Sequence, residues 1–316
     1  MTSIIPLLKE TQKKHWVVPR RPQKKDRVGF VFSTKERVDF TKQTLPSMDQ
    51  DGGYDIVWVD GSDSEEARKL PASYNFRNAG LAEYHLDIKG GPNKAIRFGL
   101  GRLIELGYDY CGLMENDILL KKGWFEKLMG LFILAADDGI AVGAATVRNF
   151  ESRVLEYRNR YTINWNIGAG MILFSRDAAK LLTENYPPIA TAQGLYKFYG
   201  KHLGLDLGTA KELWFDKPDR AMSPDFNYET VLYPRGLAAI GSVPAYAIKE
   251  LEAGVSPEER GTKYVSEEKR NFLVYKPMNR WKLPIIYIIA PFFSATWVLF
   301  KNMPWLKKLA RRVFDK

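Results

Sequence analysis

The stretch YDYCGLMENDILLKKGWFEKLM, residues 108–129, places three kinds of segment in direct succession. An apolar run ends at Met114, three polar residues follow, Glu115, Asn116 and Asp117, and a segment rich in Leu, Phe and Met at helical spacing comes next. A short apolar run bounded by polar residues is typical of a buried strand, and the later spacing is typical of a helix. The stretch therefore predicts a strand, a polar turn and a helix.

The same alternation occurs on both sides of this stretch. Apolar runs with the length of strands occupy residues 28–32, 54–60, 83–88, 108–114 and 140–147. Helical patterns lie between them, near residues 36–48, 63–69, 92–106 and 122–136. Strands that alternate with helices predict an α/β fold with a mostly parallel sheet covered on both faces.

Ligands of such sheets bind beyond the carboxyl ends of the strands, so the polar residues that follow strands are the candidates for a site. They are Ser33, Thr34 and Glu36 after the first strand, Asp60 after the second, and Glu115, Asn116 and Asp117 after the fourth.

Two carboxylates, Glu115 and Asp117, are separated by one residue on the predicted turn. At that spacing both can face a divalent cation, which takes oxygen ligands and would bridge and neutralise a diphosphate. Two acids at this spacing are common, and by spacing alone a solvated turn in which Asp117 caps the following helix is the favoured interpretation. The residues alone leave both interpretations open.

Composition limits the chemistry further. The chain has 316 residues, 45% of them hydrophobic, which suffices for a large core and fits one α/β unit with an appendage. A single cysteine, Cys111, excludes an internal disulfide and a multi-cysteine zinc site, suits a reducing compartment, and is expected in the core. The histidines His15, His85 and His202 lie far apart, so any metal would need carboxylate ligands.

The net charge of +10 is concentrated at the two ends of the chain. Residues 1–27 hold eight Lys and Arg against two acids, and residues 280–316 hold eight against one, which leaves the middle at −3. A nucleic-acid enzyme would carry its basic residues through the folded body, so this distribution favours an anionic membrane surface and no nucleic-acid partner. The segment 1–27 could be a second membrane contact, an oligomer arm or a disordered tail.

The C-terminal end carries the stronger membrane signal. Residues 283–300, LPIIYIIAPFFSATWVLF, contain no charge but include Pro284 and Pro291. As a helix they would reach about 27 Å, close to the ~30 Å hydrocarbon core, so spanning and lying in the membrane plane both stay open. The basic amphipathic segment 304–314 follows. We expect a peripheral or monotopic protein, bound through 280–316, on the cytoplasmic face of the cell membrane, since no cleavable signal precedes the body.

Four segments together carry a resemblance to a known family. RVGFVFSTKERVDFTKQTLPSM, YDIVWVDGSDSEE, GGPNKAIRFGLGRLIELGYDY and LMENDILLKKGWFEKLM follow one another in the order and at the spacing of the nucleotide-binding half of GT-A glycosyltransferases of the family 2 type. The chain resembles that family over roughly residues 27–250. The resemblance implies a Rossmann-like GT-A fold with a basic extension 1–27, a catalytic domain 28–279 divided near residue 150 into nucleotide and acceptor halves, and a membrane segment 280–316.

The resemblance assigns roles to the residues of the nucleotide half. Those that would contact the donor nucleotide are Ser33, Thr34, Glu36, Asp60, Arg97 and Asn116, with Asp60 on the base and Arg97 at the family's usual arginine. Glu115, Asn116 and Asp117 fall at the D-x-D motif, with Glu115 in place of the first aspartate. The resemblance implies that Asp117, with Glu115, holds Mn²⁺ or Mg²⁺.

The acceptor half resembles the family in two further segments. Residues 166–182, NIGAGMILFSRDAAKLL, match its Gly-rich segment, where Gly168 and Gly170 would let the backbone approach the sugar. In residues 223–248 Asp225 is the candidate catalytic base, although it also fits a helix N-cap. Glu229 is the substitute, and Asp216 and Asp219 are less favoured.

The function implied is transfer of a sugar from a UDP-, GDP- or dTDP-sugar to a lipid-linked saccharide, with inversion, on the route to a cell-surface glycan. The Q-x-x-R-W motif of processive members is absent, which predicts addition of one or few sugars. One alternative is a sugar-phosphate nucleotidyltransferase, but FSTKERVDF lacks the Gly-rich loop expected after the first strand. The other is a catalytically inactive membrane-bound module that binds nucleotide or sugar. Such a module would tolerate Glu115 in place of the first aspartate of the D-x-D motif.

Overall fold

The computed structural model describes residues 3–148, 154–168, 170–186, 190–203, 221–222, 227–245 and 247–248. The expectations for residues 280–316, Asp216, Asp219 and Asp225 lie outside these ranges. Among the described residues no helix combines the length and the hydropathy needed to cross a membrane.

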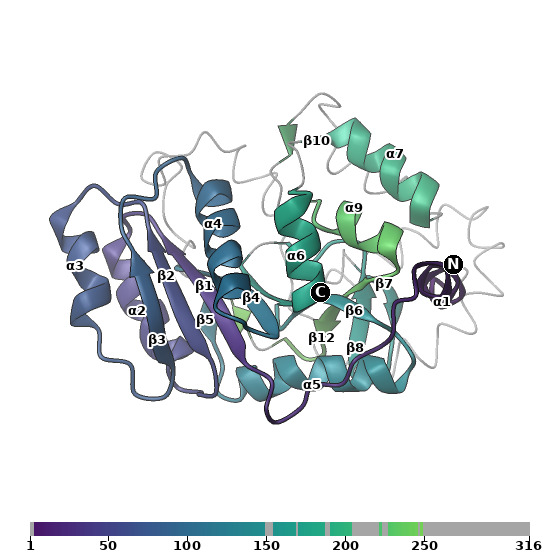
Figure 1. Cartoon of the computed structure of the whole chain (residues 1–316), viewed down its shortest axis with the longest axis horizontal. Helices are drawn as coiled ribbons and strands as arrows, with labels where there is room; N and C mark the ends of the chain where they lie inside the picture. The colour runs from purple at the N-terminus through teal and green to yellow at the C-terminus, as the bar shows by residue number, and fades with distance from the viewer. Residues whose placement is uncertain are drawn as a thin grey trace, which may run out of the picture.

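A nine-stranded sheet forms the centre of the described structure (Figure 1). Its strands, in spatial order, are β3 (Gly80–His85), β2 (Asp55–Asp60), β1 (Val28–Thr34), β4 (Tyr110–Glu115), β9 (Met171–Ser175), β6 (Val142–Thr146), β12 (Ala238–Ser242), β8 (Tyr161–Asn164) and β7 (Val154–Tyr157). β9 runs antiparallel to both neighbours and so does β8, while the other neighbours are parallel, so seven of the nine strands point the same way. The predicted α/β fold with a mostly parallel sheet is confirmed.

Helices cover both faces of the sheet (Figure 1). They are α1 (Ile5–His15), α2 (Val38–Met48), α3 (Glu65–Ser73), α4 (Pro92–Glu105), α5 (Trp124–Asp137), α6 (Arg176–Glu184), α7 (Ala192–Leu203), α9 (Glu229–Leu232) and the 3₁₀ turn η3 (Tyr233–Arg235). Two short antiparallel pairs complete the elements, β5 (Leu119–Leu120) with β13 (Ala247–Ile248) and β10 (Ala190–Thr191) with β11 (Ala221–Met222).

Side chains along β1 point alternately to the two faces of the sheet, which lets helices pack on both faces. Gly99 of α4 lies against Val31, whereas Phe30, on the opposite face, contacts Trp124 of α5 with ring centroids 5.6 Å apart. Successive strand residues face opposite sides, so one strand serves both layers. Cys111 is fully buried, and burial raises the pKa of its thiol to about 12, so its predicted place in the core is confirmed.

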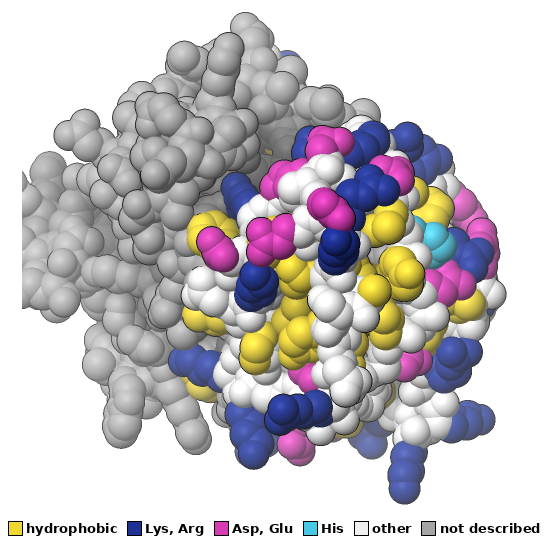
Figure 2. All heavy atoms as spheres, turned by 90° about the vertical axis from the view of Figure 1, so that its left-hand side faces the viewer, with side chains coloured by type: hydrophobic (Ala, Val, Ile, Leu, Met, Phe, Trp, Pro, Cys, Tyr) yellow, Lys and Arg dark blue, Asp and Glu magenta, His cyan; other side chains and the backbone are white. Residues whose placement is uncertain are grey.

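The edge strand β3 differs from the prediction, because it spans Gly80–His85 rather than residues 83–88. Asp87 has a φ of 63°, and the Ile88 N–H donates to the Asp60 carbonyl, so the chain has already left the strand there. Leu81 and Tyr84 of β3 are partly exposed. Figure 2 shows this end of the molecule, where apolar side chains gather between interspersed basic and acidic ones.

The N-terminal extension is folded onto the body through α1. Ile4 and Leu8 are buried, and the Gln12 side-chain amide donates to the Gly236 carbonyl at 3.0 Å. The backbone N–H of Arg27 donates to Asp109 at 3.0 Å at the far end of the extension. These contacts exclude a disordered tail for the described part of residues 1–27.

Candidate functional site

The carboxyl ends of β1, β2 and β4 bring the predicted polar residues to one edge of the sheet. The strand register pairs Thr34 with Asp60 and Ser33 with Glu115. Three segments that are far apart in sequence therefore present their polar side chains side by side, as the strand order of a parallel sheet requires.

Asp60 is the best-defined residue of this edge. Its side chain is buried, and its Oδ1 accepts hydrogen bonds from Thr34 Oγ1 at 2.8 Å and Ser62 Oγ at 2.6 Å. The indole Nε1 of Trp58 donates to Thr34 Oγ1 at 2.9 Å and so fixes the threonine hydroxyl. Asp60 Oδ2 is also buried but has no hydrogen-bond partner within the described part of the chain. One carboxylate oxygen is thus left as an acceptor.

A shallow pocket, too tight in this structure to admit a water molecule, lies beside this network. Its walls combine apolar and polar side chains, namely Thr34, Glu36, Val38, Thr41, Trp58, Ala67 and Leu70.

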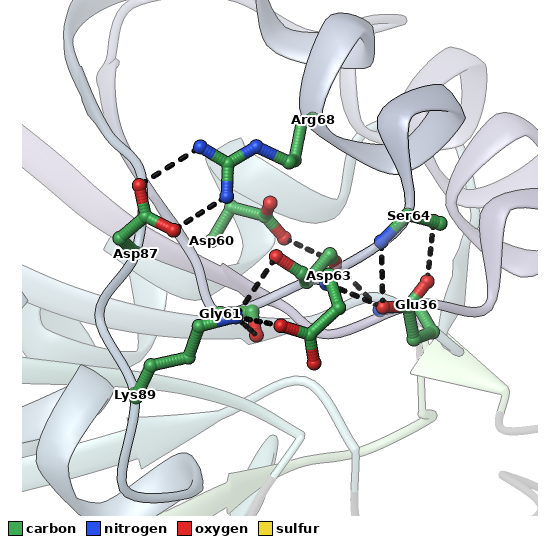
Figure 3. A network of polar contacts seen from close by, with 9 residues as sticks. Glu36, Asp60, Gly61, Asp63, Ser64, Arg68, Asp87 and Lys89 are labelled. Atoms are coloured by element: carbon green, nitrogen blue, oxygen red, sulfur yellow. Dashed lines mark hydrogen bonds and ion pairs between the residues drawn. The ribbon is translucent and has the colours of Figure 1, made fainter.

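Glu36 reaches across from the loop after β1 to the start of α3 (Figure 3). Its carboxylate accepts the backbone N–H groups of Asp63 at 2.6 Å and Ser64 at 3.1 Å, and the Ser64 hydroxyl. The Ser64 hydroxyl first, and the Asp63 N–H second, lower the pKa of Glu36. The carboxylate therefore ties two loops together while the residue still lines the pocket.

The loop after β3 is tied to α3 through Arg68 and to the loop after β2 through Lys89 (Figure 3). Arg68 binds both carboxylate oxygens of Asp87, and the Lys89 ammonium donates to the carbonyls of Gly61 at 3.2 Å and Ser62 at 3.1 Å. A loop fixed at this many points is preorganised for binding.

The acidic turn after β4 is anchored to α2 through Asn116. Its side-chain amide donates to Thr41 Oγ1 at 3.0 Å, and its carbonyl accepts from Thr44 Oγ1 at 2.9 Å. Asn116 is buried, so in this structure its amide orients the turn.

Asp117 is buried in this turn rather than exposed. The guanidinium of Arg37 lies 3.4 Å from Asp117 Oδ2. The alternative in which Asp117 caps the next helix is wrong, because Asp51 accepts the N–H groups of Gly123 and Phe125, each at 3.1 Å, at the start of α5. Sequence reasoning missed both Arg37 and Asp51, although Arg37 directly follows Glu36 in the loop after β1.

The Gly-rich loop closes against Glu115. The Glu115 N–H donates to the Gly170 carbonyl at 2.8 Å. Gly170 has a φ of 126°, and a Cβ there would lie 2.6 Å from Ile118 Cδ1 and 2.8 Å from Arg148 Nη1. Glycine is therefore required at this close approach, and it brings Arg148, which the sequence did not single out, beside the acidic turn.

Glu229 accepts hydrogen bonds from Asn166 and Ile167, near the start of the Gly-rich segment. It is fully buried, and its carboxylate accepts the Ile167 N–H at 2.8 Å and the Asn166 amide at 3.3 Å. A base that must reach an acceptor hydroxyl needs access to it, so this position suits orientation of the loop better than proton transfer. Arg97, on α4, is exposed and makes no hydrogen bond or ion pair with the described residues.

The donor set at this edge fits a metal that arrives with a phosphorylated ligand. No group of three or more His, Cys, Asp and Glu that could hold a metal occurs in the part of the chain described. Glu115 and Asp117 remain as two carboxylates on one turn, and Mg²⁺-like ions are commonly bound by one or two carboxylates together with substrate phosphates.

Comparisons with known proteins give no family for the chain. No family model matches it, and no curated protein does. A mannosyltransferase, PcManGT from Pyrobaculum calidifontis, solved with GDP-Man and Mn²⁺, is 14% identical, with 75% of this chain and 68% of that chain covered and a TM-score of 0.39.

Two other solved structures are similarly distant. TarS from S. aureus is 12% identical, with 78% of this chain and 42% of that chain covered and a TM-score of 0.45. A UTP-bound UGPase from Acinetobacter baumannii is 11% identical, with 51% and 78% covered and a TM-score of 0.35. Scores this low assign neither a family nor an activity.

Proposed function

We propose that the chain is a GT-A-type glycosyltransferase, which moves a sugar from a nucleoside diphosphate donor to an acceptor. The observation that carries the proposal is the meeting of Asp60 and the Arg37–Asp117 pair at one edge of the sheet. The first offers a hydrogen-bond acceptor to a base, and the second offers charge to a diphosphate.

Asp60 limits the base of the donor. Its Oδ2 is a buried acceptor without a protein donor among the described residues, and leaving such a group unpaired costs about 1–3 kcal/mol. Uracil, thymine and guanine each carry a ring N–H that can supply the missing bond, whereas cytosine could supply it only through its exocyclic amino group. A UDP-, dTDP- or GDP-sugar is therefore the proposed donor.

The diphosphate would lie toward the acidic turn. Asp117, with Glu115, would hold Mn²⁺ or Mg²⁺, which when bound supplies neutralising charge to the diphosphate. Arg37 already lies 3.4 Å from Asp117 and adds a fixed positive charge that a departing diphosphate also needs.

The reaction we propose is a direct displacement with inversion. An acceptor hydroxyl loses its proton to Asp225 as its oxygen bonds to the anomeric carbon, and the bond from that carbon to the diphosphate oxygen breaks with its electron pair on the leaving group. Asp225 is assigned by resemblance, and Glu229, which binds Asn166 and Ile167, would position that segment beside the acceptor. A lipid-linked saccharide is the proposed acceptor, with residues 280–316 at the cytoplasmic membrane face.

Thermal stability with nucleotides tests the donor site, because a ligand that binds only the native state raises the melting temperature. We expect UDP, GDP or dTDP, but not CMP, to raise it in the presence of Mn²⁺ or Mg²⁺. Asp60→Asn and Asp117→Ala should lose the shift, and the matched control Asp137→Asn, whose carboxylate pairs with Arg21, should keep it. No shift with any nucleotide would overturn the proposal.

Turnover separates the transferase from its two alternatives. With a nucleotide-sugar and a membrane lipid extract, the wild type should release nucleoside diphosphate. Asp225→Asn should still bind the donor but should release no nucleoside diphosphate. Release of pyrophosphate from a nucleoside triphosphate and a sugar phosphate would instead identify a nucleotidyltransferase. Donor binding without turnover in the wild type would identify a binding module.

A further inference from the structure

The C-terminal end of α1 holds a tryptophan out in solvent. Trp16 is 90% exposed and has a φ of 56°, in the left-handed region. Its backbone is fixed there, since the Trp16 N–H donates to the Lys13 carbonyl at 3.3 Å and the Val17 N–H donates to the Gln12 carbonyl at 3.0 Å. The next residue but one, Val18, is 78% exposed.

Neither packing nor backbone preference accounts for this tryptophan. The left-handed position after a helix favours glycine or asparagine, and a bulky side chain is strained in it. An indole in water also forgoes the stabilisation that burial would give. A contact made outside the described structure would explain both the residue and its placement.

The charges around Trp16 indicate the chemistry of that contact. Lys13 and Lys14, in the last turn of α1 beside Trp16, are exposed and form no ion pair with any described residue. The arginines further along the chain differ, because Arg20 pairs with Asp26 and Arg21 with Asp137. The two lysines are therefore available to an anionic partner.

This surface is firmly attached to the body. Leu8 of α1 is buried, and a Cβ on Gly236 would lie 2.7 Å from the Gln12 backbone nitrogen, so α1 approaches η3 as closely as glycine allows. Because α1 is attached firmly to the body, a contact made by Trp16 would fix the orientation of the whole domain relative to the partner.

We propose that a basic collar, made of Lys13, Lys14, Trp16 and Val18, docks on the surface of an anionic lipid bilayer. Tryptophan is favoured at the depth of the headgroups, and nearby lysines are attracted to anionic lipids. A second copy of the chain would bring the same positive charge, which opposes self-association through this surface. The proposal rests on described residues alone and does not depend on the donor site or on residues 280–316.

The single cysteine makes a local test possible. Cys111 is fully buried, so in Val18→Cys the new thiol can be labelled selectively with an environment-sensitive fluorophore while Trp16 stays intact. We expect its emission to move to the blue with vesicles of phosphatidylcholine containing about 30% phosphatidylserine, and not with phosphatidylcholine alone. The matched control, Leu81→Cys on the β3 edge, should show no change.

Substitutions measure the contribution of the collar to binding. Lys13→Gln with Lys14→Gln should raise the lipid concentration for half-saturation about 30-fold, or about fivefold per lysine. Trp16→Ala should raise it about tenfold, because an apolar contact is lost. Lys121→Gln with Lys122→Gln, an exposed pair outside the collar, should change it less than about twofold.

Three results would overturn the proposal. The first is binding of the full chain to anionic vesicles with no emission change at position 18. The second is an emission change without lipid that grows with protein concentration, which would make a second copy the occupant. The third is a change with single-stranded DNA and none with vesicles, which would make a nucleic acid the occupant.

Discussion

Replacing Gly170 by alanine tests how the Gly-rich loop meets the acidic turn. The Gly170 carbonyl accepts the Glu115 N–H, and its φ of 126° lies in a region that side chains rarely enter. The added Cβ would lie 2.6 Å from Ile118 Cδ1, and Ile118 is fully buried. A side chain is strained at this φ, and the ends of the Ile118 and Arg148 side chains would have to move to make room for it.

The expected cost combines two effects. A residue held in an unfavourable backbone region costs about 1–3 kcal/mol, and overpacking a tight interior costs about 1–3 kcal/mol more. We expect Gly170→Ala to lose about 2–6 kcal/mol of unfolding free energy. For a domain of this size that corresponds to a fall in melting temperature of about 10 °C.

Gly101→Ala is the matched control for the measurement. Gly101 lies inside α4, and a Cβ there meets nothing within 4 Å. Alanine is favoured over glycine in a helix by about 0.5–1 kcal/mol, so this variant should melt slightly above the wild type.

Both variants are followed by calorimetry and by nucleotide titration with Mn²⁺. We expect Gly170→Ala to weaken binding of the donor nucleotide, because the displaced loop no longer fixes Glu115, and Gly101→Ala to leave it unchanged. A Gly170→Ala protein that melts within about 2 °C of the wild type would refute the packing of this loop on the acidic turn.

Three further predictions concern the elements that position the site. Thr34→Val leaves the Trp58 indole N–H without its partner and should destabilise the protein by about 1–2 kcal/mol in denaturant titration. Asp51→Ala removes the acceptor for two N–H groups at the start of α5, and thermal melting should show a loss of about 1–2 kcal/mol. Hydrogen bonds from Arg102 lower the pKa of Glu83 to about 2 from 4.5, so its stabilisation is present above about pH 4 and is lost as the pH falls toward 2. Glu83→Gln should therefore show a shallower loss of stability over that acid range.

The sheet was predictable from sequence because its strands are short apolar runs that alternate with amphipathic helices. The ends of β1, β2 and β4 fall where the apolar runs stop, so the meeting of Thr34, Asp60 and Glu115 followed from parallel order alone. The boundary of β3 did not, since it lies at an edge of the sheet where half-exposed residues carry a weak apolar pattern.

The roles of individual polar residues were harder to predict, because they depend on contacts between distant segments. Asn116 and Glu36 resemble ligand-binding residues in sequence, yet in the structure their side chains bond to Thr41 and to residues 63–64. Arg37 and Arg148 carry no motif, and only the fold brings them to the acidic turn. A strand-end position predicts where a site lies better than it predicts what each side chain does there.

The most direct test of the donor site is a crystal structure of the protein with UDP, GDP or dTDP and Mn²⁺. The account predicts electron density for the base beside Thr34 and Asp60, with a base N–H within hydrogen-bonding distance of Asp60 Oδ2. It predicts the diphosphate and the metal next to Asp117 and Arg37. A nucleotide bound elsewhere on the chain, with Asp60 and Asp117 untouched, would contradict the account.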